Sequence, residues 1–273
     1  MIVAGILVSL MQGIVRYLSL ELNIYVIVFF RAFLAVLLIS TFSIKIGTKL
    51  FFSQTPKLQF FRGFLGAIAM VCFFKGLSLI TLAETTTIGF LVPTFATILA
   101  IIFYREKVGI RRWSAIMIGF IGTIIVIRPD ISIKLGSILI LISTISWAGS
   151  VLITKKLTSK DSNSTIALWQ VIYATIPAFF LAYFNWEWPD IRQIFLLIII
   201  ASLGTVAHLS INAAIKRGEI SMLMPLDYLR LIWSIIIGYL LLGDLPTDSL
   251  LLGAFLIIVS TAFITYREAK LIK

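Results

Sequence analysis

The sequence is poor in charged residues and almost lacks cysteine and histidine. Only 13% of its 273 residues are charged, and the chain holds one Cys and one His. An ordinary soluble domain carries charge on about a quarter of its residues. The lone Cys72 excludes a disulfide within one chain, and a metal site needs more Cys, His or acidic ligands than this sequence groups together. We therefore expect no metal site and no cofactor.

Long apolar runs take the place of charge. Hydrophobic residues make up 60% of the chain and its mean hydropathy is +1.08, which means more apolar surface than a soluble fold can bury. A bilayer core about 30 Å thick is crossed by roughly 20 apolar helical residues. Runs of that size recur along the whole sequence. We place ten spans near residues 2–18, 23–44, 58–80, 82–104, 109–127, 135–154, 165–184, 194–214, 220–242 and 248–266.

These spans are expected to be helices. In lipid every backbone polar group must be paired inside the protein, which only helices and closed β-barrels achieve. Barrel strands would alternate apolar and polar residues over about ten positions, whereas these runs are apolar on all sides. The predicted fold class is an all-α integral membrane protein with ten transmembrane helices. The first run has no basic region before it and no small-x-small site before Arg16, which favours a span over a cleaved signal peptide.

The charges in the loops predict an orientation, because Lys and Arg collect in the cytoplasmic loops of membrane proteins. One set of alternate loops holds sixteen Lys and Arg residues, whereas the other holds only Arg128, Lys134 and Arg192. We predict a multi-pass protein of the cell inner membrane with both termini in the cytoplasm. The net charge of +11 comes in short clusters between apolar runs, so it does not indicate nucleic-acid binding.

The sequence also shows signs of an internal repeat. Ten spans divide into two units of five, and an odd number of spans turns the second unit upside down in the membrane. Gly66 and Gly204 are 138 residues apart, and so are Glu106 and Asp244, each of which follows an apolar run. We predict two inverted five-helix repeats and a cytoplasmic tail, over residues 1–128, 135–266 and 267–273.

Five short motifs occur in order along the spans: Phe30-Arg31-Ala32, Arg62-Gly63, Ala83-Glu84 through Pro93 to Arg105-Glu106-Lys107, Gly119-Phe120-Ile121-Gly122, and Pro225 to Trp233. With these motifs the sequence resembles the drug/metabolite transporter superfamily, and within it the EamA-type proteins. The resemblance covers the whole chain and implies ten helices in two five-helix units, with a role in transport and no enzymatic activity. One departure is Leu231, which stands where a counterpart of Pro93 is expected, while Pro225 comes six residues earlier.

The segment from Pro225 to Leu231 resembles its equivalent in a subgroup that contains bacterial S-adenosylmethionine uptake carriers and, more distantly, riboflavin importers. This resemblance implies uptake or exchange of S-adenosylmethionine as the first expectation. Riboflavin, or amino acids and related metabolites, are the alternatives within the family. The alternative outside the family is a polytopic membrane enzyme, but the His-Glu pairs or clustered Asp residues that such enzymes use are absent.

Ionisable side chains within spans are the first candidates for substrate binding, because a charge at the centre of the bilayer costs about 2.5–3.5 kcal/mol on insertion scales. They are Arg31, Lys75, His208, Asp227 and Arg230. Their balance is positive, which suits an anionic or zwitterionic substrate better than a net cation. Asp227 is the only carboxylate among them, and it is therefore the natural carrier in a proton-driven mechanism.

Asp227 and Arg230 stand three residues apart, on one face of the predicted ninth helix. They can form a salt bridge that lets the helix insert, or they can line a central cavity and bind the charged ends of a zwitterionic substrate. Tyr228 adds an aromatic wall in the second interpretation. His208 can form a hydrogen bond inside the bundle or contact the substrate. Arg31 lies too deep in its span to reach the membrane surface easily.

Two prolines and one aromatic face complete the candidates. Pro93 and Pro225 each remove a backbone donor and free a carbonyl one turn earlier, so we expect hinges or cavity-lining bends there. Trp169 and Tyr173 share a face of the seventh span, where they can stack on a ring of the substrate or pack inside the bundle. The expected partners are a zwitterionic or charged small molecule and membrane lipids, with a homodimer as one possible assembly and no nucleic acid.

The expected mechanism is alternating access, in which two inverted units rock about a site near the bilayer midplane. The sequence contains no Gly-x4-Gly-Lys-Ser/Thr motif, so this chain does not itself hydrolyse ATP through such a loop. An ion gradient and substrate exchange both remain as energy sources. The direction of transport is equally open at this level.

Overall fold

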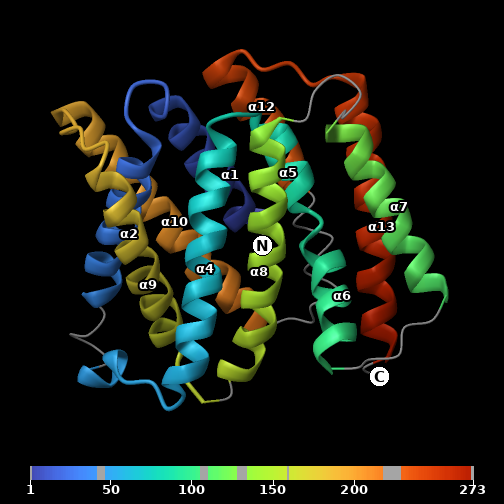
Figure 1. Cartoon of the computed structure of the whole chain (residues 1–273), viewed down its shortest axis with the longest axis horizontal. Helices are drawn as coiled ribbons and strands as arrows, with labels where there is room; N and C mark the ends of the chain where they lie inside the picture. Colours follow the sequence, from blue (N-terminus) through green and yellow to red (C-terminus); the bar gives the residue numbers. More distant parts are fainter. Residues whose placement is uncertain are drawn as a thin grey trace.

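The computed structural model describes residues 2–41, 47–104, 110–127, 134–158, 160–217 and 229–271. In these parts of the chain all regular secondary structure is helical (Figure 1). The elements are α1 (Ile2–Leu18), α2 (Ile24–Ser40), the 3-10 helix η1 (Thr48–Phe51), α4 (Pro56–Leu77), α5 (Leu82–Gly89), α6 (Val92–Tyr104), α7 (Ile110–Ile127), α8 (Leu135–Leu157), α9 (Asn163–Tyr183), α10 (Ile191–Arg217), α12 (Arg230–Leu242) and α13 (Asp248–Leu271).

The helices follow the predicted spans, with ends that differ by a few residues. Within the described residues, five helical stretches are long and apolar enough to cross a membrane: Pro56–Leu77, Leu82–Phe103 (α5 and α6 taken together), Leu135–Thr154, Asn163–Tyr183 and Ile191–Ser210. Shorter apolar helices account for the other five: Val3–Leu18, Ile24–Ser40, Ile116–Ile127, Arg230–Leu242 and Asp248–Ser260. The ninth predicted span, 220–242, is described only from residue 229 onward, so Pro225, Asp227 and Tyr228 lie outside the described residues.

The fourth predicted span, 82–104, is two helices and not one. A capping box starts α5, in which the Thr81 hydroxyl accepts from the Glu84 N–H and the Glu84 carboxylate accepts from the Thr81 N–H. The helix ends at Gly89, a turn follows at residues 90–91, and α6 begins at Val92 with Pro93 in its first turn. A proline fits there because its missing N–H has no intrahelical partner to lose. The sequence predicted a bend near Pro93, and the structure has a complete break.

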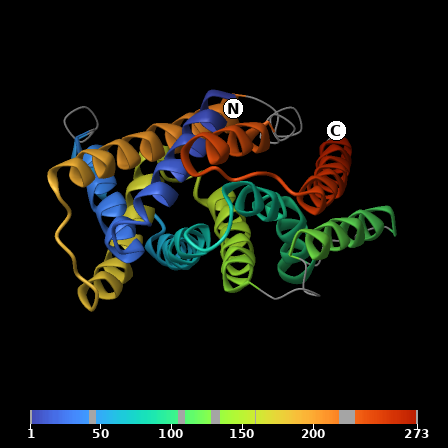
Figure 2. The same cartoon turned by 90° about the horizontal axis from the view of Figure 1, so that it is seen from above.

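The main contacts between helices are symmetric between the two halves of the chain: when each helix is replaced by its equivalent in the other half, the same contacts result. Helix α2 packs against α9, and α7 against α13, each pair joining equivalent positions of the halves. The pair α4 and α8 has its counterpart in α10 and α1. Seen from above, α7 and α13 lie together at one side of the molecule, with α2 and α10 toward the other (Figure 2). This matching of contacts is what two related five-helix units would produce.

Glycines let two of these pairs approach closely. A Cβ at Gly122 of α7 would lie 2.9 Å from the Gly253 carbonyl of α13, and one at Gly76 of α4 would lie 2.9 Å from the Gly136 carbonyl of α8. Small residues at such crossings are typical of helices that associate in membranes. We call the end of the bundle with the α12–α13 connection, uppermost in Figure 1, the Asp244 end, and the opposite end the Asp161 end.

Candidate functional site

Arg230, the first residue of α12, lies beside the break between α5 and α6. Its guanidinium carbon is 5.4 Å from the centre of the Phe90 ring, and its Nη2 is 3.8 Å from the point where a Cβ of Gly89 would stand. The last carbonyls of a helix carry about half a negative charge, which a cation stabilises. Because α5 has eight residues, about 12 Å at 1.5 Å per residue, the break lies near the middle of a bilayer core.

Three buried hydroxyl groups join α1, α5 and α12 between this arginine and the Asp244 end. The Ser234 hydroxyl lies 2.8 Å from that of Thr86 and 3.4 Å from that of Ser9. Both serines also donate to the Arg230 carbonyl, at 2.9 Å from Ser234 and 3.3 Å from Ser9. The sequence analysis did not single out these residues. A usable signal was the spacing of Ser234, one turn after Arg230 on the same face.

Arg31 of α2 is buried at the centre of its helix. Only 6% of its surface is exposed, and its Nη1 donates to the Met70 sulfur at 3.0 Å. The guanidinium carbon lies 5.7 Å from the centre of the Phe74 ring. Its Nη2 and Nε face α10, at 3.3 and 3.5 Å from the position of a Cβ on Gly204. These contacts are all with other parts of the protein, and a role for Arg31 in substrate binding stays a prediction.

His208 lies one turn beyond Gly204 on α10. Its ring meets that of Trp147 of α8 edge to face, with centroids 6.0 Å apart. It is partly buried and stands four residues after Gly204, whose missing Cβ would lie 3.3 Å from the Arg31 Nη2. His208 therefore shares one region with Arg31, whereas Trp147 is a neighbour that sequence reasoning missed.

Trp169 and Tyr173 lie on the face of α9 that packs against α4. The Tyr173 ring covers Gly63, where a Cβ would collide with it, and meets the Phe60 ring edge to face at 5.7 Å. The Trp169 and Tyr173 rings are 5.6 Å apart, and the buried Trp169 Nε1 has no hydrogen-bond partner among the described residues. Packing inside the bundle, one of the two interpretations of this face, accounts for these contacts.

Arg62 and Asp161 form a polar network at the Asp161 end that the sequence analysis did not anticipate. Arg62 of α4 donates to the Thr154 hydroxyl at 2.7 Å, the Ile166 carbonyl at 3.0 Å and the Gln170 side-chain oxygen at 2.8 Å. It thereby connects α4 to both α8 and α9. The sequence analysis counted Arg62 among the basic residues of a loop, but it is 5% exposed.

Asp161 precedes α9 and binds the segment that leads into α4. Its carboxylate accepts from the Ser53 hydroxyl, from the Gln54 N–H at 3.0 Å and from the Gln59 amide at 2.9 Å. Burial opposes ionisation of this carboxyl group, but these hydrogen bonds and the charge of Lys160 outweigh it and lower its pKa. The carboxylate thus ties the second half of the chain to the first.

Ion pairs tie the two halves together at the Asp244 end. They join Arg16 to Asp244, Glu84 to Lys134 at 2.9 Å and Glu21 to Arg192 at 3.2 Å. The pair of Arg16 and Asp244 is the least exposed, with side chains 17% and 19% accessible. Each pair links a residue before 128 to one after 133, so the halves are joined by charge at this end.

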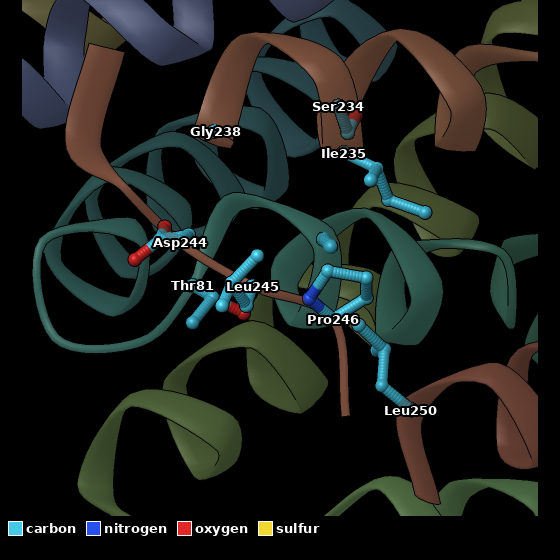
Figure 3. Close-up of a pocket in the computed structure, with 9 residues that line it drawn as sticks. Thr81, Ser234, Ile235, Gly238, Asp244, Leu245, Pro246 and Leu250 are labelled. Carbon is cyan, nitrogen blue, oxygen red and sulfur yellow. The ribbon is translucent and has the colours of Figure 1, made fainter. Parts of the chain in front are cut away.

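A small pocket opens beside Asp244, between the start of α5, α12 and the α12–α13 connection (Figure 3). Its lining includes Thr81, Ser234, Gly238 and Pro246. It has room for about one water molecule, so it is not a site for a metabolite.

The profile of the EamA-like transporter family matches residues 1–128 and again residues 134–266. The chain belongs to the EamA-like transporter family. This confirms the resemblance found in the sequence, which includes membership of the drug/metabolite transporter superfamily. A solved crystal structure that is 13% identical covers 98% of both chains with a TM-score of 0.61, which shows the same fold.

Relatives of this EamA-like chain carry names of transporters. An S-adenosylmethionine uptake transporter of Rickettsia bellii is 28% identical over 93% of this chain and 88% of its own length. A riboflavin transporter of Vibrio cholerae is 37% identical over 65% of this chain and 60% of its own. A pseudopaline exporter of Pseudomonas aeruginosa is 22% identical over 95% and 92%. The chain is a multi-pass membrane transporter of small molecules, and the prediction of a transport role without enzymatic activity is confirmed.

Proposed function

We propose that this chain is an inner-membrane secondary transporter that carries S-adenosylmethionine by alternating access between two inverted repeats, with both termini in the cytoplasm. The repeat units are residues 1–128 and 135–266, followed by the tail 267–273. The observation that carries this proposal is the placement of two cations: Arg31 at the centre of α2, and Arg230 beside the break between α5 and α6. Broken helices and buried charges near the midplane are the parts from which secondary transporters build substrate sites.

The packing supports the mechanism. The pairs α2–α9 and α7–α13 each join equivalent helices of the two halves. The ion pairs and hydrogen bonds described at the two ends also run from one half to the other. Opening one end therefore requires breaking the ties at that end while those at the other end hold. This is the sequence of events that alternating access demands.

The cargo is proposed from relatives, since S-adenosylmethionine is a net cation and its match to the positive interior is through its carboxylate alone. The relatives named for S-adenosylmethionine uptake cover almost the whole chain, and S-adenosylmethionine has a carboxylate that a positively charged interior can bind. Its sulfonium and ammonium groups need a counter-charge, which we assign to Asp227. Substrate contacts are proposed for Asp227, Arg230, Tyr228, Arg31, His208, Trp169 and Tyr173, and hinges for Pro93 and Pro225.

Riboflavin is the second candidate, and specific observations favour it. The relative named as a riboflavin transporter has 37% identity in the matched region, and this chain has the Phe90 ring beside the Arg230 guanidinium and the Trp147 ring against His208. Such rings stack on flat ring systems. Riboflavin carries no charge, however, and would offer no anion to Arg31, which has no counter-charge among the described residues.

The deciding experiment is uptake by proteoliposomes that contain the purified full chain. Labelled S-adenosylmethionine, riboflavin and a mixture of amino acids are offered to the wild type, Asp227→Asn and Arg230→Ala. We expect uptake of S-adenosylmethionine by the wild type and a loss of about tenfold or more in both variants, since each removes a charge from a desolvated site. Lys57→Gln is the control, because Lys57 is an exposed residue in the first turn of α4 and takes no part in the proposed site or in the ties named above. Equal uptake by all four proteins would contradict the site assignment.

A further inference from the structure

The guanidinium of Arg31 is a buried cation with no counter-charge among the described residues. Three ion pairs occur in that part of the chain, and Arg31 belongs to none of them. Within that part of the chain its one hydrogen bond goes to a thioether, the weak acceptor of Met70, and its Nε has no acceptor. An arginine carries five N–H donors, so the described residues leave most of its capacity unused. A buried cation without a counter-charge in the described part of a membrane protein is a candidate for binding an anionic ligand.

The unused donors lie on one edge of the guanidinium. Nη2 and Nε both face Gly204, at 3.3 and 3.5 Å from the position that a Cβ would take there. These two atoms carry the parallel N–H groups that a carboxylate accepts as a pair. Gly204 leaves this edge free of a side chain from α10. Met11 and Met70, which flank the group, are unbranched and adapt easily to a ligand.

Two further buried oxygens on the helices that meet at Gly204 have no partner in the described part of the chain. Gln12 is 4% exposed and Thr205 is 9% exposed, and the side-chain oxygen of each has no hydrogen bond among the described residues. Gln12 follows Met11 on α1, and Thr205 follows Gly204 on α10. Buried polar groups are normally satisfied, so these two oxygens are further candidates for contact with a polar ligand.

We propose that Arg31 is the carboxylate-binding residue of the transport site, with its Nε and Nη2 donating to the two oxygens of an amino-acid carboxylate on the cargo. The inference rests on the proposed function, and it narrows the substrate class to carboxylate-bearing molecules. Gln12 and Thr205 supply acceptors for the neighbouring ammonium group. Arg230, at the break between α5 and α6, is assigned to contact another part of the cargo.

The test compares ligands that differ only in the carboxylate. Binding of S-adenosylmethionine and its decarboxylated form, and of methionine and methioninol, is measured by titration calorimetry on the purified full chain. The wild type is expected to prefer each acid by about 10- to 100-fold, the range for a paired, charged hydrogen bond. Arg31→Met should bind each acid and its carboxylate-free partner alike. Arg31→Lys, which keeps the charge and loses the paired donors, should retain only part of the preference.

Two further variants separate a ligand effect from a folding effect. Gly204→Ala places a methyl group 2.9 Å from the Met11 sulfur, which must shift, and 3.3 Å from Nη2. It is expected to weaken binding of the acids more than binding of their carboxylate-free partners. Arg62→Lys alters another buried arginine and is expected to keep the preference for acids. The inference is overturned if Arg31→Met still prefers the acids, or if the wild type treats the paired ligands alike. A wild type that transports only uncharged compounds such as riboflavin would overturn it as well, while leaving the transport function intact.

Discussion

At the scale of single residues, the two buried arginines Arg31 and Arg62 differ in their hydrogen-bond acceptors, and this difference predicts opposite effects on stability when each is replaced. Among the described residues, Arg62 has three oxygen acceptors on two other helices, whereas Arg31 has only a sulfur and a ring. Arg62→Met removes these charge-assisted bonds and leaves the Gln170 and Thr154 oxygens with fewer partners. We expect it to destabilise the chain by about 2–4 kcal/mol.

Arg31→Met is the matched control for that substitution, because it removes a cation that no described residue compensates. Its stability should stay within about 1 kcal/mol of the wild type, or exceed it. Both variants are compared by thermal unfolding of the purified chain in one detergent. A larger loss in Arg31→Met than in Arg62→Met would contradict the distinction.

Asp161 predicts a pH dependence with a definite sign. Its pKa is lowered in the folded chain by the hydrogen bonds from Ser53, Gln54 and Gln59, which outweigh its burial. A carboxyl group with a depressed folded pKa stabilises the fold above its unfolded pKa, near 4, and this contribution is lost as the pH falls through the folded value. The difference in melting temperature between the wild type and Asp161→Asn should therefore be clear at pH 6 and shrink toward pH 3. An equal difference at both pH values would contradict this assignment.

Sequence reasoning reached some of these residues and not others, for a physical reason. Arg31, Arg230 and His208 stood out because a charged or ionisable side chain in an apolar run is costly wherever it occurs. The roles of Arg62 and Asp161 depend on partners about 90 to 110 residues away in the chain, which no local pattern records. The position of Asp227 relative to Arg230 stays a prediction.

At the scale of elements, the break between α5 and α6 is the feature on which the site depends. The sequence predicted a disturbance there because Pro93 cannot donate to Gly89. It could not predict that Arg230 would lie against the break, because that contact joins helices separated by more than 130 residues. The spans themselves were predictable, since bilayer thickness fixes the length of an apolar run.

Pro93→Ala restores the N–H and is expected to favour one continuous helix from α5 into α6. We expect it to leave stability unchanged or raise it by about 1 kcal/mol, through the regained hydrogen bond, while transport falls by about tenfold. Gly89→Ala is the control, because its Cβ would lie 3.8 Å from the Arg230 Nη2, an ordinary contact, and the proline stays. Uptake and unfolding are measured on the same preparations. Normal uptake by Pro93→Ala would mean that the break is not needed for transport.

At the scale of the whole molecule, the two ends of the bundle are closed by related contacts. Glu21, which precedes α2, pairs with Arg192 at the start of α10. Asp161, which precedes α9, binds the residues at the start of α4. Exchange of the two halves converts one contact into the other, since α2 corresponds to α9 and α4 to α10. The charge count predicted which loops were basic, but only the structure shows which residues pair across the halves.

Among the ion pairs at the Asp244 end, the one between Arg16 and Asp244 should, when lost, most change the equilibrium between the closed and open states of that end. It joins α1 to the connection between α12 and α13, and it is largely shielded from solvent, so its coupling should exceed that of an exposed pair. Asp244→Arg sets two cations against each other and should favour opening at this end. A change of 1.4 kcal/mol in this balance alters the open population about tenfold.

The opening can be followed through Ser234, which is buried between α1 and α5 close to this pair. Because Cys72 is the only cysteine, Cys72→Ser gives a background in which Ser234→Cys is the single thiol. A water-soluble maleimide should label that thiol about tenfold faster in Asp244→Arg and in Arg16→Asp than in the unaltered background. The exchanged pair, Arg16→Asp with Asp244→Arg, should restore slow labelling, since attraction returns with the charges reversed. If all four proteins are labelled at the same rate, this ion pair does not hold the Asp244 end closed.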